Sequence, residues 1–194
     1  MLRRLFESVL LIAILAALAQ SANAEESVSI ADFGEAGISD KLGVSVMNPI
    51  DPDQWINFKL EDQPDGRRVL NLEYDIDSNQ PAEVEFWLRL EGADISRFDT
   101  LILKMRGDPE KGFTKNTVVQ FTDLNGQKAS YVLTGIESEW KEFRIPFKRF
   151  SRIRDWSRVK EFGIVFDAIN TNPKKGVLYV SRVYVSTRIR SASK

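Results

Sequence analysis

Hydrophobic and polar residues alternate with a period of two along most of the chain. In the segment 69–77, Leu70, Leu72, Tyr74 and Ile76 fall on one side of an extended backbone, and acidic or amide side chains fall on the other. Such alternation is typical of a β-strand that is buried on one face only. No sustained helical period competes with it, so the pattern predicts an all-β protein.

The same alternation recurs in many short segments with turns between them. The predicted strands are 27–33, 55–60, 69–77, 83–91, 101–106, 117–123, 129–134, 140–147, 161–167 and 176–186. The two strands 117–123 and 129–134 are joined through Asn125-Gly126, the preferred centre of a tight hairpin turn. This arrangement predicts a single antiparallel β-sandwich domain over residues 25–186.

The remaining segments carry turn chemistry. Short helical turns are expected near 94–98 and 155–158, with Asp94 and Asp155 as N-caps. The Gly-, Asp- and Pro-rich residues 34–54 and 61–67 are expected to be irregular. The basic residues 187–194 are expected to form a flexible tail.

The first 24 residues have the features of a secretory signal peptide. A basic start precedes an unbroken apolar run of eleven residues from Val9 to Ala19, and small residues Ala22 and Ala24 stand at the −3 and −1 positions of a cleavage site. The run is much shorter than the ~20 residues that span a bilayer. The sequence therefore predicts cleavage after Ala24, a periplasmic or secreted product, and no transmembrane segment after cleavage.

Composition excludes several kinds of chemistry. The chain of 194 residues contains no cysteine and no histidine. It therefore cannot supply a Cys/His zinc site, a Ser-His-Asp or Cys-His triad, a His general base or a redox dithiol.

Charge is unevenly distributed along the chain. Residues 25–100 hold 18 acids and 6 bases, whereas residues 101–194 hold 9 acids and 19 bases. With a slight net negative charge overall, nucleic acid is not an expected partner.

Trp87 is the most informative candidate for ligand binding. It falls on the polar side of its strand between Glu85 and Arg89, where a flat indole can stack on a sugar ring while its neighbours bind hydroxyl groups. The alternative is that a loop covers this face. Other outward positions would form a polar surface with Trp87 if their strands share its sheet. They are Lys104, Arg106, Gln120, Thr122, Glu142, Arg144 and Asp167.

Other aromatic and basic residues allow two interpretations each. Trp140 and Trp156 are expected to anchor the core or a loop, and Trp55 fits either role. The segment 141–160 carries eight bases against two acids. It could bind an anionic polysaccharide, lipid headgroups or an acidic partner, or it could be a solvated surface paired with the acidic half of the chain.

The order of several segments resembles two families of the galactose-binding-domain-like jelly-roll fold. These segments are Ile30–Phe33, Phe98–Asp108, Glu139–Phe147, Asp155–Phe166 and Gly176–Val185. They resemble family 11 carbohydrate-binding modules and the complex I intermediate-associated protein family. The resemblance implies a non-catalytic domain that binds polysaccharide or contacts proteins during assembly of a complex.

One departure from this resemblance concerns calcium. Members of the fold often hold a structural calcium ion with acidic residues of the first and last strands. Asp32 is present here, but the last strand has Ser181 and Arg182 where an acidic pair would be expected. An arginine would repel the ion, so no metal or other cofactor is expected.

Three functions follow from these features, in decreasing order of support. The first is an exported, non-catalytic module that binds carbohydrate. The second is a cell-envelope assembly or scaffolding factor that docks through 141–160. The third is a glycosidase, which would need only two suitably spaced carboxylates, although no acid here sits in a recognisable catalytic motif.

Overall fold

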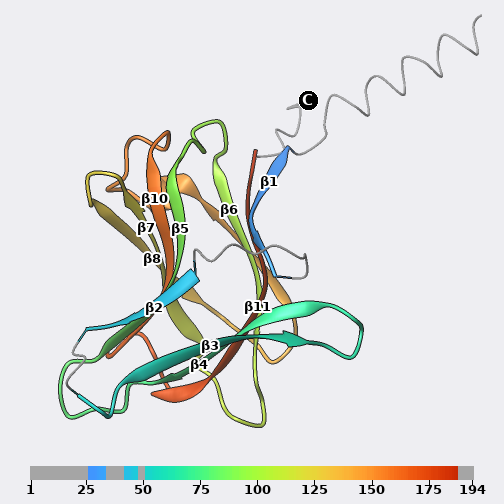
Figure 1. Cartoon of the computed structure of the whole chain (residues 1–194), viewed down its shortest axis with the longest axis vertical. Helices are drawn as coiled ribbons and strands as arrows, with labels where there is room; N and C mark the ends of the chain where they lie inside the picture. Colours follow the sequence, from blue (N-terminus) through green and yellow to red (C-terminus); the bar gives the residue numbers. More distant parts are fainter. Residues whose placement is uncertain (1–25, 34–41, 48–50, 188–194) are drawn as a thin grey trace, which may run out of the picture.

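Two antiparallel β-sheets build the domain (Figure 1), which confirms the predicted β-sandwich. The computed structural model describes residues 26–33, 42–47 and 51–187. Sheet A contains β1 (Ser27–Asp32), β3 (Trp55–Asp62), β4 (Arg68–Asp75), β6 (Thr100–Gly107), β9 (Lys141–Pro146) and β11 (Lys175–Ser186). Sheet B contains β2 (Leu42–Val46), β5 (Glu83–Ala93), β7 (Asn116–Asp123), β8 (Lys128–Thr134) and β10 (Val159–Asp167).

The strand order brings distant parts of the sequence together. Sheet A has the order β3-β4-β11-β6-β9, and sheet B has the order β2-β5-β10-β7-β8. One edge of β11 is shared, because β4 pairs with its residues 175–180 and β1 pairs with its residues 182–186. In Figure 1 the β3–β4 hairpin lies across the lower part of the view, while β5, β7, β8 and β10 of sheet B run side by side above it.

The alternating apolar residues of both sheets meet in one continuous core. Tyr74 of β4 stacks on Phe166 of β10, with ring centroids 4.1 Å apart, and so joins the two sheets. Phe121 of β7 is the centre of an aromatic cluster that includes Phe150 and Trp156, each with its centroid 5.2 Å away. The predicted anchoring role of Trp156 is thereby confirmed.

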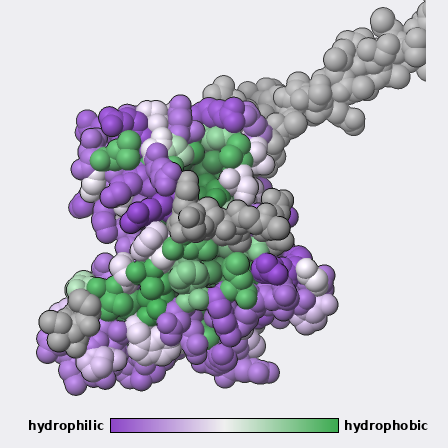
Figure 2. Space-filling model, in the orientation of Figure 1, coloured by the Kyte–Doolittle hydropathy of each residue, from purple (hydrophilic) through white to green (hydrophobic). Residues whose placement is uncertain are grey.

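Sheet A leaves part of its inner face in contact with solvent at its β3 edge. Phe58 and Leu60 of β3 point to the core side but remain 36% and 39% exposed. Phe58 still packs edge-on against Phe86, with centroids 5.5 Å apart. Figure 2 shows hydrophobic side chains gathered in this lower part of the molecule, whereas most of the remaining visible surface is polar.

The structure differs from the sequence predictions in three places. β2 lies within the segment 34–54, for which the sequence predicts irregular structure. Near Asp94 and Asp155 the chain forms turns, in which each carboxylate accepts the backbone N–H two residues later, rather than helical turns. The described helix is instead a short 3₁₀ helix, η1 (Phe147–Arg149).

The β7–β8 hairpin forms as predicted, but its turn is wider than a two-residue one. The N–H of Asp123 donates to the carbonyl of Gln127, and Gly126 adopts a positive φ of 80°. The carboxylate of Asp123 also accepts the N–H groups of Asn125 and Gln127, both at 2.8 Å.

Among the described residues, no helix is long and apolar enough to cross a membrane. The predicted leader 1–24 and all but the first residue of the predicted tail lie outside the described residues.

Candidate functional site

A row of five residues crosses the outer face of sheet B, perpendicular to its strands. Register places Trp87 of β5 opposite both Gly43 of β2 and Gly163 of β10. Gly163 is in turn opposite Gln120 of β7, which is opposite Ser130 of β8. With neighbouring strands about 4.8 Å apart, this transverse row spans roughly 19 Å. It is long enough to contact several linked rings of an extended ligand.

Trp87 lies flat against β2 because Gly43 has no side chain. Its strand neighbours Phe86 and Leu88 are in the core, so the alternation places Trp87 on the outer face, as predicted. A Cβ on Gly43 would come within 2.1 Å of Cζ2 of the Trp87 ring. The exposed guanidinium of Arg89 stacks on the same ring, with its Cζ 4.9 Å from the ring centroid. The half-buried indole therefore already accepts one planar partner.

Next to Trp87, Glu85 and Gln120 form a hydrogen-bonded pair that is almost withdrawn from solvent. Gln120 Nε2 donates to Glu85 Oε1 at 2.8 Å, and Ser130 Oγ donates to Gln120 Oε1 at 3.2 Å. A Cβ on Gly163 would come within 2.1 Å of Glu85 Oε1, so this glycine allows the carboxylate to lie over β10. The pair is thus held in a fixed position beside Trp87, with only a small part of each side chain exposed.

Burial raises the pKa of Glu85 above its ordinary value. The ammonium of Lys128, 3.9 Å from Glu85 Oε2, and the amide of Gln120 act in the opposite direction but do not cancel the effect. Thr122, also on this face, has a buried Oγ1 without a hydrogen-bond partner among the described residues. Buried polar atoms are nearly always paired, so this hydroxyl is an exception on the face, and its burial keeps it out of contact with a ligand.

The predicted site residues divide between two opposite faces. Trp87, Arg89, Glu85, Gln120 and Asp167 belong to sheet B. Of these, Asp167 stands at the end of β10 and is used by its own turn. Its carboxylate accepts the N–H groups of the two residues 169 and 170.

Lys104, Arg106 and Arg144 belong to sheet A, because β6 pairs with β9 and β11. They therefore cannot share a surface with Trp87. Arg106 lies between Tyr179 and Trp140, with its Cζ 4.2 Å and 5.3 Å from the respective ring centroids. Arg144 Nε donates to Glu142 Oε1 at 2.9 Å. Trp140 is thus an anchor on the outer face of sheet A.

The site considered for calcium contains an ion pair. Arg182 Nε of β11 lies 3.0 Å from Asp32 Oδ2 of β1. The guanidinium therefore contacts the carboxylate that the resemblance would assign to the metal. Within the described residues, no group of three acidic side chains is placed to hold a metal ion.

Sequence reasoning did not select Gly43, Gly163, Lys128 or Ser130. Gly163 carried a usable signal, since an isolated glycine within a strand often marks a close approach of another group. Gly43 could not be found in this way, because its strand was not predicted. Lys128 and Ser130 join the site only through the β7–β8 register.

Solved structures share this architecture. A family 11 carbohydrate-binding module of the cellulosomal cellulase Lic26A-Cel5E of Clostridium thermocellum is similar over 88% of this chain and 98% of its own, with a TM-score of 0.63 and 14% identity. A family 11 module from the same organism, in complex with a β-1,3-1,4-mixed-linked tetrasaccharide, has a TM-score of 0.64 and 16% identity over 85% of this chain and 96% of its own. The likeness is one of fold.

An exo-β-agarase is also similar, with a TM-score of 0.59 and 9% identity, over 81% of this chain but only 24% of its own. The fold thus also occurs as part of a longer enzyme. No family model and no curated protein matches the sequence. The function must therefore be argued from the site itself.

Proposed function

We propose that this domain is exported and binds a carbohydrate chain across the transverse row without cleaving it. The observation that carries the proposal is the row itself, which crosses five strands. It presents a flat indole that lies on Gly43, and a hydrogen-bonded Glu85–Gln120 pair whose carboxylate lies over Gly163. The leader predicted at residues 1–24 supports export. The oligosaccharide complex of the family 11 module supports the ligand class.

Binding would combine stacking with hydrogen bonds. The C–H face of a sugar ring would replace the Arg89 guanidinium on Trp87, because the arginine is exposed and its stacking contact is weak, about 0.5–1 kcal/mol. The released guanidinium could then donate to hydroxyl groups. The Glu85–Gln120 pair, with each residue 7% exposed, offers further acceptors beside the ring.

The test is affinity electrophoresis of two matched tryptophan variants. Trp87→Ala removes the indole from sheet B, while Trp140→Ala removes one from the outer face of sheet A. Soluble mixed-linked β-glucan, agarose oligosaccharides and dextran serve as neutral probes. We expect wild type and Trp140→Ala to be retarded by the same glycan and Trp87→Ala to lose retardation with little change in melting temperature. Equal retardation of Trp87→Ala and wild type would contradict the proposal.

Catalysis needs a separate measurement, because a buried carboxyl with a raised pKa is also what a general acid requires. Glu85 has this property. The same glycans are therefore incubated with wild type and Glu85→Gln, and new reducing ends are counted. We expect none from either protein. Release of reducing ends by wild type alone would replace the binding proposal with a glycosidase.

A second candidate, an envelope assembly factor, rests on the basic segment 141–160. Lys141 and Arg144 have acidic partners. Six further cations of this segment are exposed and form no ion pair with a described residue. They are Lys148, Arg149, Arg152, Arg154, Arg158 and Lys160. Reversing Arg149, Arg152 and Arg154 to Glu should remove a salt-sensitive protein partner if this function holds, and leave glycan retardation unchanged.

A further inference from the structure

A pocket lies where β4 and β1 share one edge of β11. β4 pairs with β11 as far as residue 180 and β1 from residue 182 onwards, so Ser181 stands at the junction of the two pairings. The pocket has a volume of about 360 Å³ and is lined from β1, β6, β11 and the β3–β4 hairpin. It belongs to sheet A, so it is separate from the transverse row on sheet B.

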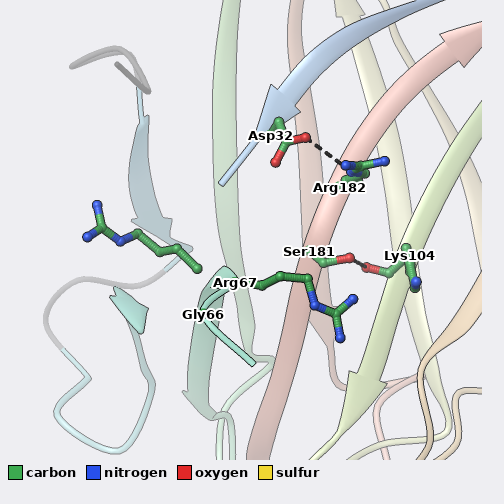
Figure 3. Close-up of a pocket in the computed structure, with 7 residues that line it drawn as sticks. Asp32, Gly66, Arg67, Lys104, Ser181 and Arg182 are labelled. Atoms are coloured by element: carbon green, nitrogen blue, oxygen red, sulfur yellow. Dashed lines mark hydrogen bonds and ion pairs between the residues drawn. The ribbon is translucent and has the colours of Figure 1, made fainter. Parts of the chain in front are cut away.

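Four cations and one carboxylate line this pocket. The cations are Arg67, Arg68, Lys104 and Arg182, and the carboxylate is Asp32. Figure 3 shows the side chain of Arg67 extending from the hairpin toward the strands that carry Lys104 and Arg182.

Acidic partners reduce this positive charge only in part. Asp32 pairs with Arg182, while Asp65 and Asp62 of the hairpin bind the Nε atoms of Arg67 and Arg68 at 2.8 Å and 2.9 Å. Among the described residues, the half-buried Lys104 has no carboxylate within 4.0 Å of its ammonium. One cation of the pocket is therefore left to attract an external anion.

The strand register adds a reason to expect such an anion. Lys104 of β6 is directly opposite Arg182 of β11. On its other side it is opposite Glu142 of β9, whose two carboxylate oxygens are bound by Arg144 and Tyr184. Like charges at directly opposite positions of an antiparallel pair destabilise the sheet. An anionic group bound between them would relieve this repulsion.

A second hollow adjoins the pocket and is lined with hydroxyl groups. It has a volume of about 350 Å³, shares Asp32 and Arg182 with the pocket, and adds Ser27, Ser29 and Tyr184. Hydroxyl groups beside a carboxylate suit the ring hydroxyls of a sugar, whereas a free inorganic anion would use only the cationic part. The two hollows together therefore favour an acidic saccharide over a small anion.

We infer that this face of sheet A binds an acidic polysaccharide, with a carboxylate or sulfate substituent between Lys104, Arg182 and Arg67 and the adjacent sugar hydroxyls along Ser27, Ser29 and Asp32. The site extends the proposed carbohydrate binding to the opposite face of the domain. It does not depend on Trp87, so either site can fail in an experiment without the other.

The test compares polysaccharides that share a backbone and differ in charge. Dextran, carboxymethyl-dextran and dextran sulfate form one set, and methyl-esterified and de-esterified polygalacturonate form the other. Affinity is measured in about 0.15 M salt, where free charges more than ~8 Å apart are largely screened. We expect at least one acidic polymer to bind this face of sheet A. The neutral polymer with the same backbone should bind it much more weakly. Absence of binding to every acidic polymer would overturn the inference.

Charge-matched variants locate the site. Lys104→Gln combined with Arg67→Gln should weaken binding of the acidic polymer about tenfold or more, because charged hydrogen bonds are lost. Lys111→Gln combined with Lys115→Gln removes the same charge from exposed residues outside both the pocket and the segment 141–160, and should have little effect. Equal losses from both pairs, or a loss from the control pair alone, would overturn the inference.

Two further readouts distinguish this site from the transverse row and from a simple anion site. Trp87→Ala should retain the acidic polymer even where it loses a neutral glycan. Sodium sulfate at the same concentration of anionic groups should displace the polymer poorly, since it cannot use the hydroxyl-lined hollow. Displacement by sulfate as effective as by the soluble acidic saccharide would show that the pocket binds a free anion instead.

Discussion

Substituting Gly43 tests the role of Trp87 without removing the indole. In Gly43→Ala, the new Cβ would stand 2.1 Å from Cζ2 of Trp87, whereas ordinary contact begins at 3.4 Å. The ring must therefore move by about 1.3 Å or tilt away from β2. The backbone gains from the reduced freedom of the unfolded chain, about 0.4–1 kcal/mol, and this offsets part of the cost of moving a half-buried ring.

We expect a loss of glycan affinity that is large relative to any loss of stability. A stacked aromatic contact contributes about 0.5–1.5 kcal/mol beyond its buried area, so a displaced ring should weaken binding roughly two- to twelvefold. The melting temperature should change by less than about 4 °C, the shift that corresponds to roughly 1 kcal/mol in a domain of this size. Isothermal titration with the retained glycan gives the affinity, and tryptophan fluorescence of the variant reports the altered environment of the ring.

Ser45→Ala is the matched control, because Ser45 lies on the same strand and on the same face as Gly43. It should leave both affinity and fluorescence close to wild type. If Gly43→Ala changes the fluorescence while affinity stays the same, Trp87 does not contact the sugar and the reasoning fails.

Three other substitutions probe buried polar groups. Burial raises the pKa of Glu85, so wild-type stability should fall as pH rises from the ordinary value of 4.5 through the raised pKa. Glu85→Gln should lack this fall when denaturant unfolding is followed from pH 4.5 upward. Tyr74→Phe leaves the Thr114 N–H, now bonded to the Tyr74 hydroxyl at 2.8 Å, without a partner, and should cost about 1–3 kcal/mol of unfolding free energy. An unchanged value would show that another group takes its place. Asp123→Ala removes the acceptor for two turn N–H groups, one of them from Gln127, and should cost about 1–2 kcal/mol, with Asn125→Ala as a milder comparison.

The strands could be predicted from the sequence because burial on one face imposes a local pattern. In β5, for example, Val84, Phe86 and Leu88 alternate with the outward-facing Glu85 and Trp87, and the sheet buries the three apolar residues as expected. β2 carries a weaker signal, since it is a five-residue edge strand that contains Gly43 and Ser45. Such a segment resembles a loop in composition, and it is a strand because it pairs with β5.

Membership of a sheet could not be predicted in the same way. The alternation shows that Lys104 and Arg106 point outward, but it contains no information on which of two outer faces they occupy. That choice depends on pairing between β6 and β11, which are separated by more than sixty residues. For the same reason, the proximity of Asp32 to Arg182 is a product of the fold and not of sequence spacing.

The pairing of β1 with β11 also decides how the domain connects to other parts of a polypeptide. Ser27 is opposite Ser186, and the N–H of Thr187 donates to the carbonyl of Glu26 at 2.9 Å. Any chain that continues before residue 26 or after residue 187 must leave from one corner of the sandwich, where Figure 1 places β1 beside the end of β11. The domain is thus geometrically suited to insertion into a host protein or to circular permutation through a short linker.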